Sequence, residues 1–283
     1  MKLGAHIGIS RGLRWTAAEA LRLRCKCIQI FLSNPRGWAA SPADDESDVA
    51  EWRRALATHG ISPVMGHSSY LVNLASPDPE LWRKSLASAS AAIRRGLALG
   101  ADRFIIPGGY HKGVGEKRGR RALARGLREL SQIAGGGMRL LLENTTGAGS
   151  GMNWRFEDMA ASLAEAGDEP NLGVCLDTCH LHVAGYDMSS ADSVKRVLGD
   201  FDRIVGLSRL GAMHLNDAKH PVGSRRDAHT HIGKGTIGRE AFRALLADRR
   251  LADLPGVIET PKEDGWDARN LGRLRRMRSS ARP

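Results

Sequence analysis

The chain has 283 residues, of which 42% are hydrophobic and 26% charged, and its formal net charge is +11. This composition is typical of soluble globular proteins, and no apolar run reaches the roughly 20 residues of a transmembrane helix. The first ten residues begin a strand-like pattern and lack the features of a signal peptide, so we expect a cytoplasmic protein without a membrane partner. The positive charge suits a phosphate-rich partner, although an arginine-rich solvated surface would give the same balance.

Eight short apolar segments alternate along the chain with eight amphipathic ones. Strands are predicted at 3–9, 27–31, 63–67, 103–106, 139–143, 172–177, 212–215 and 257–259. Helices are predicted at 12–24, 46–59, 79–99, 116–133, 156–165, 191–205, 239–249 and 264–277. Continuous apolar strands are typical of parallel strands that are buried on both faces.

This alternation favours an α/β fold, a single (β/α)8 TIM barrel that spans residues 1–283 with a basic carboxyl-terminal tail at about 273–283. An open, doubly wound sheet is the alternative, but no GxGxxG loop follows the first strand. The four cysteines are Cys25, Cys27, Cys175 and Cys179. They include no CxxC pair, so we expect reduced and buried thiols.

Metal-type side chains stand at or just beyond the ends of several predicted strands. In a (β/α)8 barrel these carboxyl ends surround one mouth, where residues that are distant in sequence meet. The candidate ligands are His67, Glu143, Asp177, His180, His214, Asp227, His229 and Glu259. Imidazole and carboxylate suit zinc first among the divalent metals. Since one zinc ion takes about four ligands, the set suggests two or three Zn²⁺ ions that share a carboxylate, an arrangement suited to phosphodiester hydrolysis.

Nine segments of the chain together carry a more specific signal, and they are residues 4–6, 67–74, 142–145, 173–180, 184–187, 214–219, 223–229, 233–238 and 258–260. These segments resemble the endonuclease IV family of abasic-site DNA repair enzymes. These segments keep one order from about residue 3 to residue 262. The resemblance implies the same barrel with a zinc centre. It also implies cleavage of duplex DNA on the 5′ side of an abasic nucleotide, which leaves a 3′-hydroxyl, by an enzyme that we expect to be a monomer.

The resemblance also implies a role for each candidate. His67 would serve the first zinc, Glu143 would bridge the first and second, Asp177, His214 and Glu259 would complete the second, and His180, Asp227 and His229 would hold the third. Glu143 and Glu259 are the predicted catalytic residues. Arg36, Tyr70 and Leu71 match positions that enter the bent duplex at the lesion, a use that fits an inserted wedge.

One segment departs from the family pattern. The family's fourth strand ends in His–Pro–Gly, and that His is a ligand of the first zinc, whereas residues 104–111 read FIIPGGYH. Ile106 precedes Pro107, so we expect Ile106 in the ligand place and His111 as a strained substitute. The first metal position is therefore predicted to be weak or empty.

Two other functions share these features. A metal-dependent sugar isomerase or epimerase would use the same barrel and similar ligands, but it would show no salt-dependent affinity for duplex DNA. A binder of damaged DNA with impaired catalysis would keep the DNA affinity but would not regain turnover when zinc is supplied.

Overall fold

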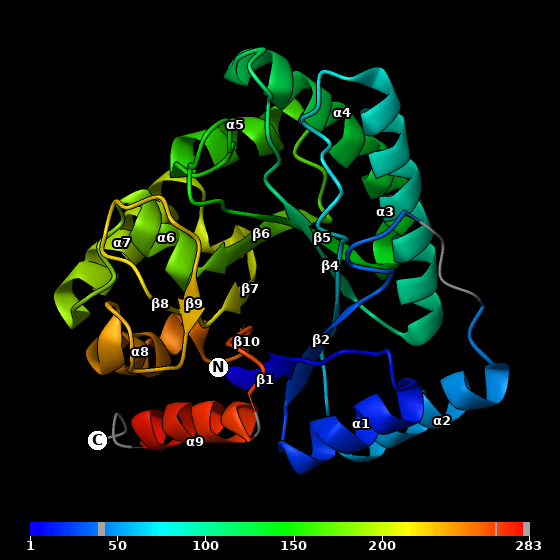
Figure 1. The fold of residues 1–283 in the computed structure, drawn as a ribbon, viewed down its shortest axis with the longest axis vertical. Helices are drawn as coiled ribbons and strands as arrows, with labels where there is room; N and C mark the ends of the chain where they lie inside the picture. The colour runs from blue at the N-terminus through cyan, green and yellow to red at the C-terminus, as the bar shows by residue number, and fades with distance from the viewer. Residues whose placement is uncertain (39–42, 264, 280–283) are drawn as a thin grey trace.

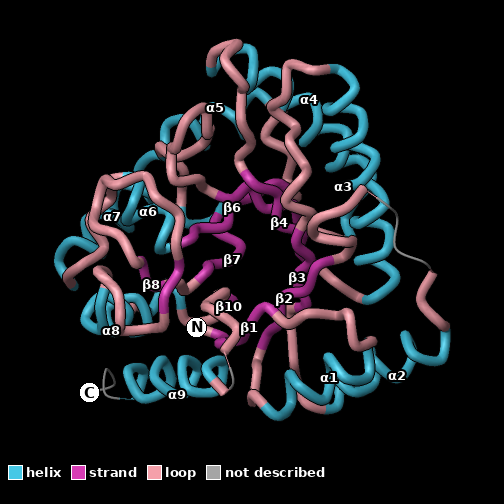
Figure 2. Tube along the Cα trace, viewed as in Figure 1, coloured by secondary structure: helices cyan, strands magenta, loops and turns pink. Residues whose placement is uncertain are grey.

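Eight parallel strands close into a barrel in the order β1-β10-β7-β6-β5-β4-β3-β2. The structure is a computed structural model that describes residues 1–38, 43–263 and 265–279. The strands form an inner ring, drawn in magenta in Figure 2, and the helices surround it in cyan. The predicted (β/α)8 barrel is confirmed.

Each predicted strand and helix has a counterpart in the structure. The barrel strands are β1 (Lys2–His6), β2 (Cys27–Phe31), β3 (Val64–His67), β4 (Arg103–Pro107), β5 (Arg139–Glu143), β6 (Leu172–Asp177), β7 (Leu210–His214) and β10 (Pro255–Ile258). The outer helices are α1 (Leu13–Arg22), α2 (Glu46–Thr58), α3 (Pro79–Leu99), α4 (Glu116–Ala134), α5 (Phe156–Glu165), α7 (Ala191–Ile204), α8 (Gly238–Ala247) and α9 (Trp266–Ser279). In Figure 1, α9 (red) lies beside β1 (blue), so the last helix packs next to the first strand.

Two short features beyond β6 were not predicted. Helix α6 (Thr178–Ala184) follows β6 without a loop, and strands β8 (Asp217–Ala218) and β9 (His229–Thr230) form an antiparallel pair within the loop after β7. A helix of seven residues makes about two turns and a strand of two residues has no alternation, so neither shows a recognisable hydrophobic period.

The predicted basic tail is largely helical. Residues 273–279 form the second half of α9, and Leu274 and Met277 are buried there. Residues 280–283 of the predicted tail lie outside the described residues. None of the helices within the described ranges combines the length and the hydropathy that crossing a membrane requires.

Side chains alternate along the barrel strands and so form two distinct apolar clusters. One cluster fills the space between strands and helices, and it includes Ile28, Phe104, Ile106 and Leu142. The other fills the barrel interior and consists of Cys27, Met65, Ile105, Leu141, Cys175, Ala212 and Val257. β1 contributes Gly4 at this level, where a Cβ atom would overlap the carbonyl oxygen of Cys27.

Two residues beyond this interior cluster, each strand reaches the mouth of the barrel. We call the residues at this level the mouth ring: His6, Gln29, His67, Pro107, Glu143, Asp177, His214 and Glu259. The period of two that directs the apolar cluster inward also directs the mouth ring inward. The fold therefore places polar side chains from all strands except β4 on an apolar floor.

Candidate metal centre

The mouth ring lies at the base of a cavity of about 840 Å³. Its walls include Tyr70, Tyr110 and Lys262 from the loops that follow the strands. Asp177 and His214 are completely buried below the cavity, whereas Asp227 stands at its exposed side. All eight predicted ligands lie in or directly beneath this mouth.

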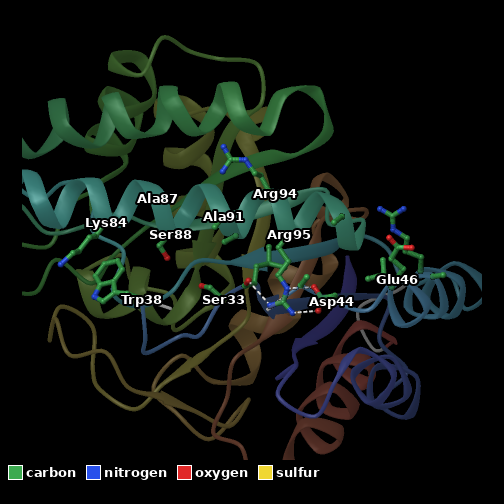
Figure 3. A pocket seen from close by; sticks show the side chains of 17 residues that line it. Ser33, Trp38, Asp44, Glu46, Lys84, Ala87, Ser88, Ala91, Arg94 and Arg95 are labelled. Carbon is green, nitrogen blue, oxygen red and sulfur yellow. Dashed lines mark hydrogen bonds and ion pairs between the residues drawn. The ribbon is translucent and has the colours of Figure 1, made fainter. Parts of the chain in front are cut away.

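A larger cavity of about 1070 Å³ lies between α2 and α3 (Figure 3). Small residues such as Ala87 and Ala91 line it, and Arg95 closes one side through an ion pair of 2.7 Å with Asp44. The groups of metal-type side chains within the described residues lie elsewhere. Chemistry rather than size therefore identifies the candidate site.

Glu143, Asp177, His214 and Glu259 form the most buried group of potential ligands. Their ligating atoms all lie within 4.8 Å of one another. Nδ1 of His214 lies 2.8 Å from a Glu143 oxygen, 3.2 Å from a Glu259 oxygen and 3.7 Å from a carboxylate oxygen of Asp177. Three carboxylates thus face one imidazole nitrogen that is completely buried.

The electric field in this group favours a positive charge. Burial acts to raise the pKa of Glu143 and to lower that of His214, because each charged form loses hydration. The facing charges outweigh burial: His214 holds the pKa of Glu143 below its usual range, and Glu259 and Glu143 raise the pKa of His214 well above its own. A divalent cation near Nδ1 of His214 would meet the same stabilising field.

His180, Asp227 and His229 form a second group of potential ligands, nearer to solvent. Nε2 of His180 and Nε2 of His229 lie 3.3 and 3.4 Å from the two oxygens of Asp227. Nε2 of His229 is also 3.6 Å from Asp177, and it is buried without a hydrogen-bond partner. A buried imidazole nitrogen that lies between two carboxylates without a hydrogen bond is better explained by a bound metal ion than by a network of hydrogen bonds.

His67 has a less complete environment. Its Nε2 lies 3.5 Å from Glu143, and the groups of three or more ligating side chains found among the described residues do not include it. Asp177 of the buried group also faces His229 of the second group at 3.6 Å, and Glu143 connects the buried group to His67. The geometry thus offers two complete metal positions and one that lacks a third ligand.

Pro107, rather than Ile106, occupies the place of the missing ligand. Pro107 pairs with Glu143 in the β4–β5 register and lines the cavity, while Ile106 pairs with Leu142 and packs outward beneath the helices. The prediction that Ile106 occupies this place is therefore wrong by one residue. Because both faces of β4 are apolar, its sequence does not reveal which residues point inward.

His111 does not replace the missing ligand either. Its Nδ1 accepts hydrogen bonds of 3.2 Å from the backbone N–H groups of Gly113 and Gly115, in the turn before α4. It belongs to none of the metal-type groups found in the described part of the chain. Its role in the structure is to order this turn.

Comparisons with known proteins agree with this geometry. The model of the xylose isomerase-like TIM barrel family matches residues 17–279. The chain is 40% identical over 279 residues to the probable endonuclease 4 of Chloroflexus aurantiacus, covering 98% of each protein. It is 37% identical over 267 residues to the probable endonuclease 4 of Halothermothrix orenii, covering 94% of this chain and 96% of that protein. The chain belongs to the endonuclease IV family.

A solved structure supports the same assignment. Endonuclease IV from Thermus thermophilus superposes with a TM-score of 0.88 at 34% identity, covering 99% of this chain and 100% of that one. A D-tagatose 3-epimerase-like protein superposes with a TM-score of 0.72 at 16% identity, a likeness that shows the shared fold alone. The family is one of nucleases, so an enzyme that acts on nucleic acid is the coarse functional conclusion.

In this member of the endonuclease IV family, the three predicted DNA-contacting residues lie in two loops beside the mouth. Tyr70 is 66% exposed and packs edge-on against Phe31 with ring centroids 5.2 Å apart. Its backbone N–H donates to the Pro35 carbonyl at 3.1 Å, which ties its loop to the loop that carries the exposed Arg36. Leu71 is half-buried beside Tyr70. The insertion of these side chains into DNA stays a prediction.

Sequence reasoning missed the polar residues that hold the ligands in place. Asn216 donates to Asp177 at 2.7 Å through its side-chain nitrogen, while its side-chain oxygen accepts from the backbone N–H of Glu259, also at 2.7 Å. Asn144 accepts from the backbone N–H of Asp177 at 2.7 Å. Both asparagines fall within segments that carry the family resemblance, which was the available signal.

Two further members of the mouth ring, His6 and Gln29, were also not assigned to the site. Nδ1 of His6 lies 3.2 Å from Glu259, and Gln29 contacts His6, Glu259 and His214. The signal for Gln29 was one polar residue within an apolar strand, CIQIF, where it is completely buried.

Proposed function

We propose that this chain is a zinc-dependent endonuclease that cleaves duplex DNA on the 5′ side of abasic nucleotides and leaves a 3′-hydroxyl. The observation that carries the proposal is the pair of ligand groups joined through Asp177 in the mouth of the barrel. The names of the relatives support an endonuclease, and the net charge of +11 suits a DNA partner.

Each ligand group has a part in this proposal. Glu143, Asp177, His214 and Glu259 would hold one zinc ion, and His180, Asp227 and His229 would hold another. Bound zinc would supply Lewis acidity toward phosphate oxygens and would activate water at neutral pH. Glu143 and Glu259 are the proposed catalytic residues, because their carboxylates face both His214 and the open cavity.

The first position differs in this chain. His67 and Glu143 face one another, but Pro107 offers no ligand atom beside them. We therefore propose two strongly bound zinc ions, with the first position weak or empty. Nδ1 of His67 donates to the carbonyl of Ser68 at 2.8 Å, which leaves Nε2, 3.5 Å from Glu143, as the atom that would hold a metal ion at this position.

The proposed substrate contact places duplex DNA across the mouth, with Arg36, Tyr70 and Leu71 at the lesion. An exposed aromatic ring beside a guanidinium group suits insertion into an unstacked base step together with a phosphate contact. A monomer in the cytoplasm is the proposed working form.

The decisive experiment incubates the purified protein with a labelled duplex that carries one abasic site. We expect a single nick on its 5′ side with a 3′-hydroxyl end, and we expect no nick on the intact duplex. His214→Ala and a strong chelator should each abolish the nick. Absence of cleavage by the zinc-loaded wild-type protein would refute the proposed activity.

The same experiment separates the two alternatives. A damaged-DNA binder with impaired catalysis would bind the abasic duplex without cutting it at any zinc concentration. A sugar isomerase or epimerase, which only the shared fold supports, would show neither cleavage nor salt-dependent binding of duplex DNA.

A further inference from the structure

Each of the four histidines among the candidate ligands has one ring nitrogen that faces a carboxylate of the site. The other ring nitrogen lies next to an oxygen atom that is not a candidate ligand. Three contacts involve backbone carbonyls, those of His67 with Ser68 at 2.8 Å, His180 with Asn144 at 2.9 Å and His229 with Glu259 at 3.1 Å. Carbonyl oxygens only accept, so these contacts fix the proton on Nδ1 and leave Nε2 free for a metal.

His214 differs from the other three in the kind of partner it uses. Its Nε2 lies 2.8 Å from the side-chain oxygen of Gln29, a residue 185 positions away in the sequence. Both side chains are completely buried, so water does not replace this contact. His214 is thus the histidine of this set whose orientation depends on a side chain that can be substituted.

The chemistry of the neighbours fixes which way the Gln29 amide faces. Its nitrogen lies 2.6 Å from Oε1 of Glu259 and 2.8 Å from Nδ1 of His6. An ionised carboxylate only accepts hydrogen bonds, so the NH₂ group must face Glu259. The amide oxygen therefore faces His214, and Nε2 of His214 must carry the proton.

We infer that Gln29 is a positioning residue that selects the Nε2-protonated tautomer of His214 and thereby directs the unprotonated Nδ1 toward the metal position between Glu143, Asp177 and Glu259. The same amide holds Oε1 of Glu259, which leaves Oε2 facing Nδ1 of His214 at 3.2 Å. One side chain thus orients two of the four ligands in the buried group. The inference rests on the proposed function only in that a metal ion occupies this group.

One substitution separates the hydrogen bond from the packing. Gln29→Met keeps a similar volume but offers His214 no comparable acceptor and cannot donate to Glu259. Gln132→Met, in an exposed position of α4, is the matched control because Gln132 is the other glutamine of the chain.

The measurement is zinc affinity by competition with a chromophoric chelator, with metal content determined after dialysis. We expect the tightest zinc affinity to fall about 10–100-fold in Gln29→Met and to be unchanged in Gln132→Met. Wild-type affinity in Gln29→Met, or an equal loss in Gln132→Met, would overturn the inference. Thermal unfolding of the metal-free proteins verifies that each variant folds.

A second measurement needs no Gln29 variant. Long-range ¹H–¹⁵N spectra of the zinc-loaded wild-type protein, with the His214 signals assigned, should show a protonated Nε2 and a metal-bound Nδ1. A metal-bound Nε2 would contradict the inference even if Gln29→Met failed to fold. Neither readout uses DNA, so failure of the Gln29 role and failure of the nuclease activity are distinguishable.

Discussion

At the scale of single residues, one step of strand register determines which side chain faces the candidate metal centre. Pro107 stands opposite Glu143, and its neighbour Ile106 packs between β4 and the helices. Adjacent residues of one strand therefore have different neighbours, although both are apolar. A histidine introduced at each position should have opposite effects.

We predict that Pro107→His adds about one zinc ion per chain, because its imidazole would join His67 and Glu143 as a third ligand. Ile106→His should instead lower the free energy of unfolding by about 2–5 kcal/mol, since it replaces a buried aliphatic side chain with a polar ring. Elemental analysis and denaturant unfolding test the two effects. A gain of metal in Ile106→His but not in Pro107→His would mean that the register is wrong.

Burial also determines thiol reactivity. Burial raises the pKa of the Cys25 thiol to about 11, so at pH 8 only roughly one molecule in a thousand carries the reactive thiolate at this position. We predict that Cys25 in the native protein reacts slowly with a disulfide reagent at pH 8 and that its rate rises with pH toward the raised pKa. All four thiols should react at once in guanidinium chloride. Rapid labelling of native Cys25 would show that this site is open to solvent.

At the scale of elements, the direct passage from β6 into α6 places two groups of ligands side by side. Asp177 ends the strand and caps the helix, since one of its oxygens accepts from the backbone N–H of His180 at 3.0 Å. Its other oxygen faces His214 at 3.7 Å and His229 at 3.6 Å. One carboxylate thus orders the helix that carries His180 and also joins the two groups.

Asp177→Asn should separate these two roles. Asparagine is an effective N-cap, so the metal-free variant should fold and keep α6. We predict that zinc, which should raise the melting temperature of the wild-type protein by binding the native state, has a much smaller effect on this variant. Calorimetry with and without zinc measures the difference, and an undiminished shift would show that Asp177 is not a ligand.

At the scale of the whole molecule, the charge of +11 and the wedge loops should contribute to DNA binding in different ways. Phosphate contacts release counterions, so affinity should fall with salt at a slope of about −0.9 per contact on a double logarithmic plot. We predict that Arg36→Ala reduces this slope by about one unit. Equilibrium binding over a range of salt concentrations measures it, and an unchanged slope would exclude a phosphate contact by Arg36.

Tyr70→Ala should have a different signature. Removal of an inserted ring lowers the preference for an abasic duplex over an intact one, and it leaves the salt slope unchanged because no charge is lost. Competition binding between the two duplexes measures the preference. If the preference for the abasic duplex persisted in full, Tyr70 would be only a packing residue of its loop.

The sequence by itself determined the barrel and the identity of the candidate ligands. Eight apolar runs separated by amphipathic helices leave few folds to consider, and in such a barrel the carboxyl ends of the strands meet at one mouth. Metal-type residues at those ends could therefore be grouped before any coordinates were known. Tertiary structure brings these eight residues into one mouth, and the metal role assigned to each of them stays a proposal.

Only the tertiary structure decided which side of a strand each residue faces and which distant residues contact each other. Both faces of β4 are apolar, so its sequence does not show which of its residues face the barrel interior. For this reason the sequence predicts Ile106 in the place that Pro107 occupies. The partnership of Gln29 with His214 spans 185 positions, and no local pattern encodes it. The hydrophobic period of a strand shows that alternate side chains face the same side. Which side chains from different strands meet inside the barrel depends on how the strands pair when the barrel closes.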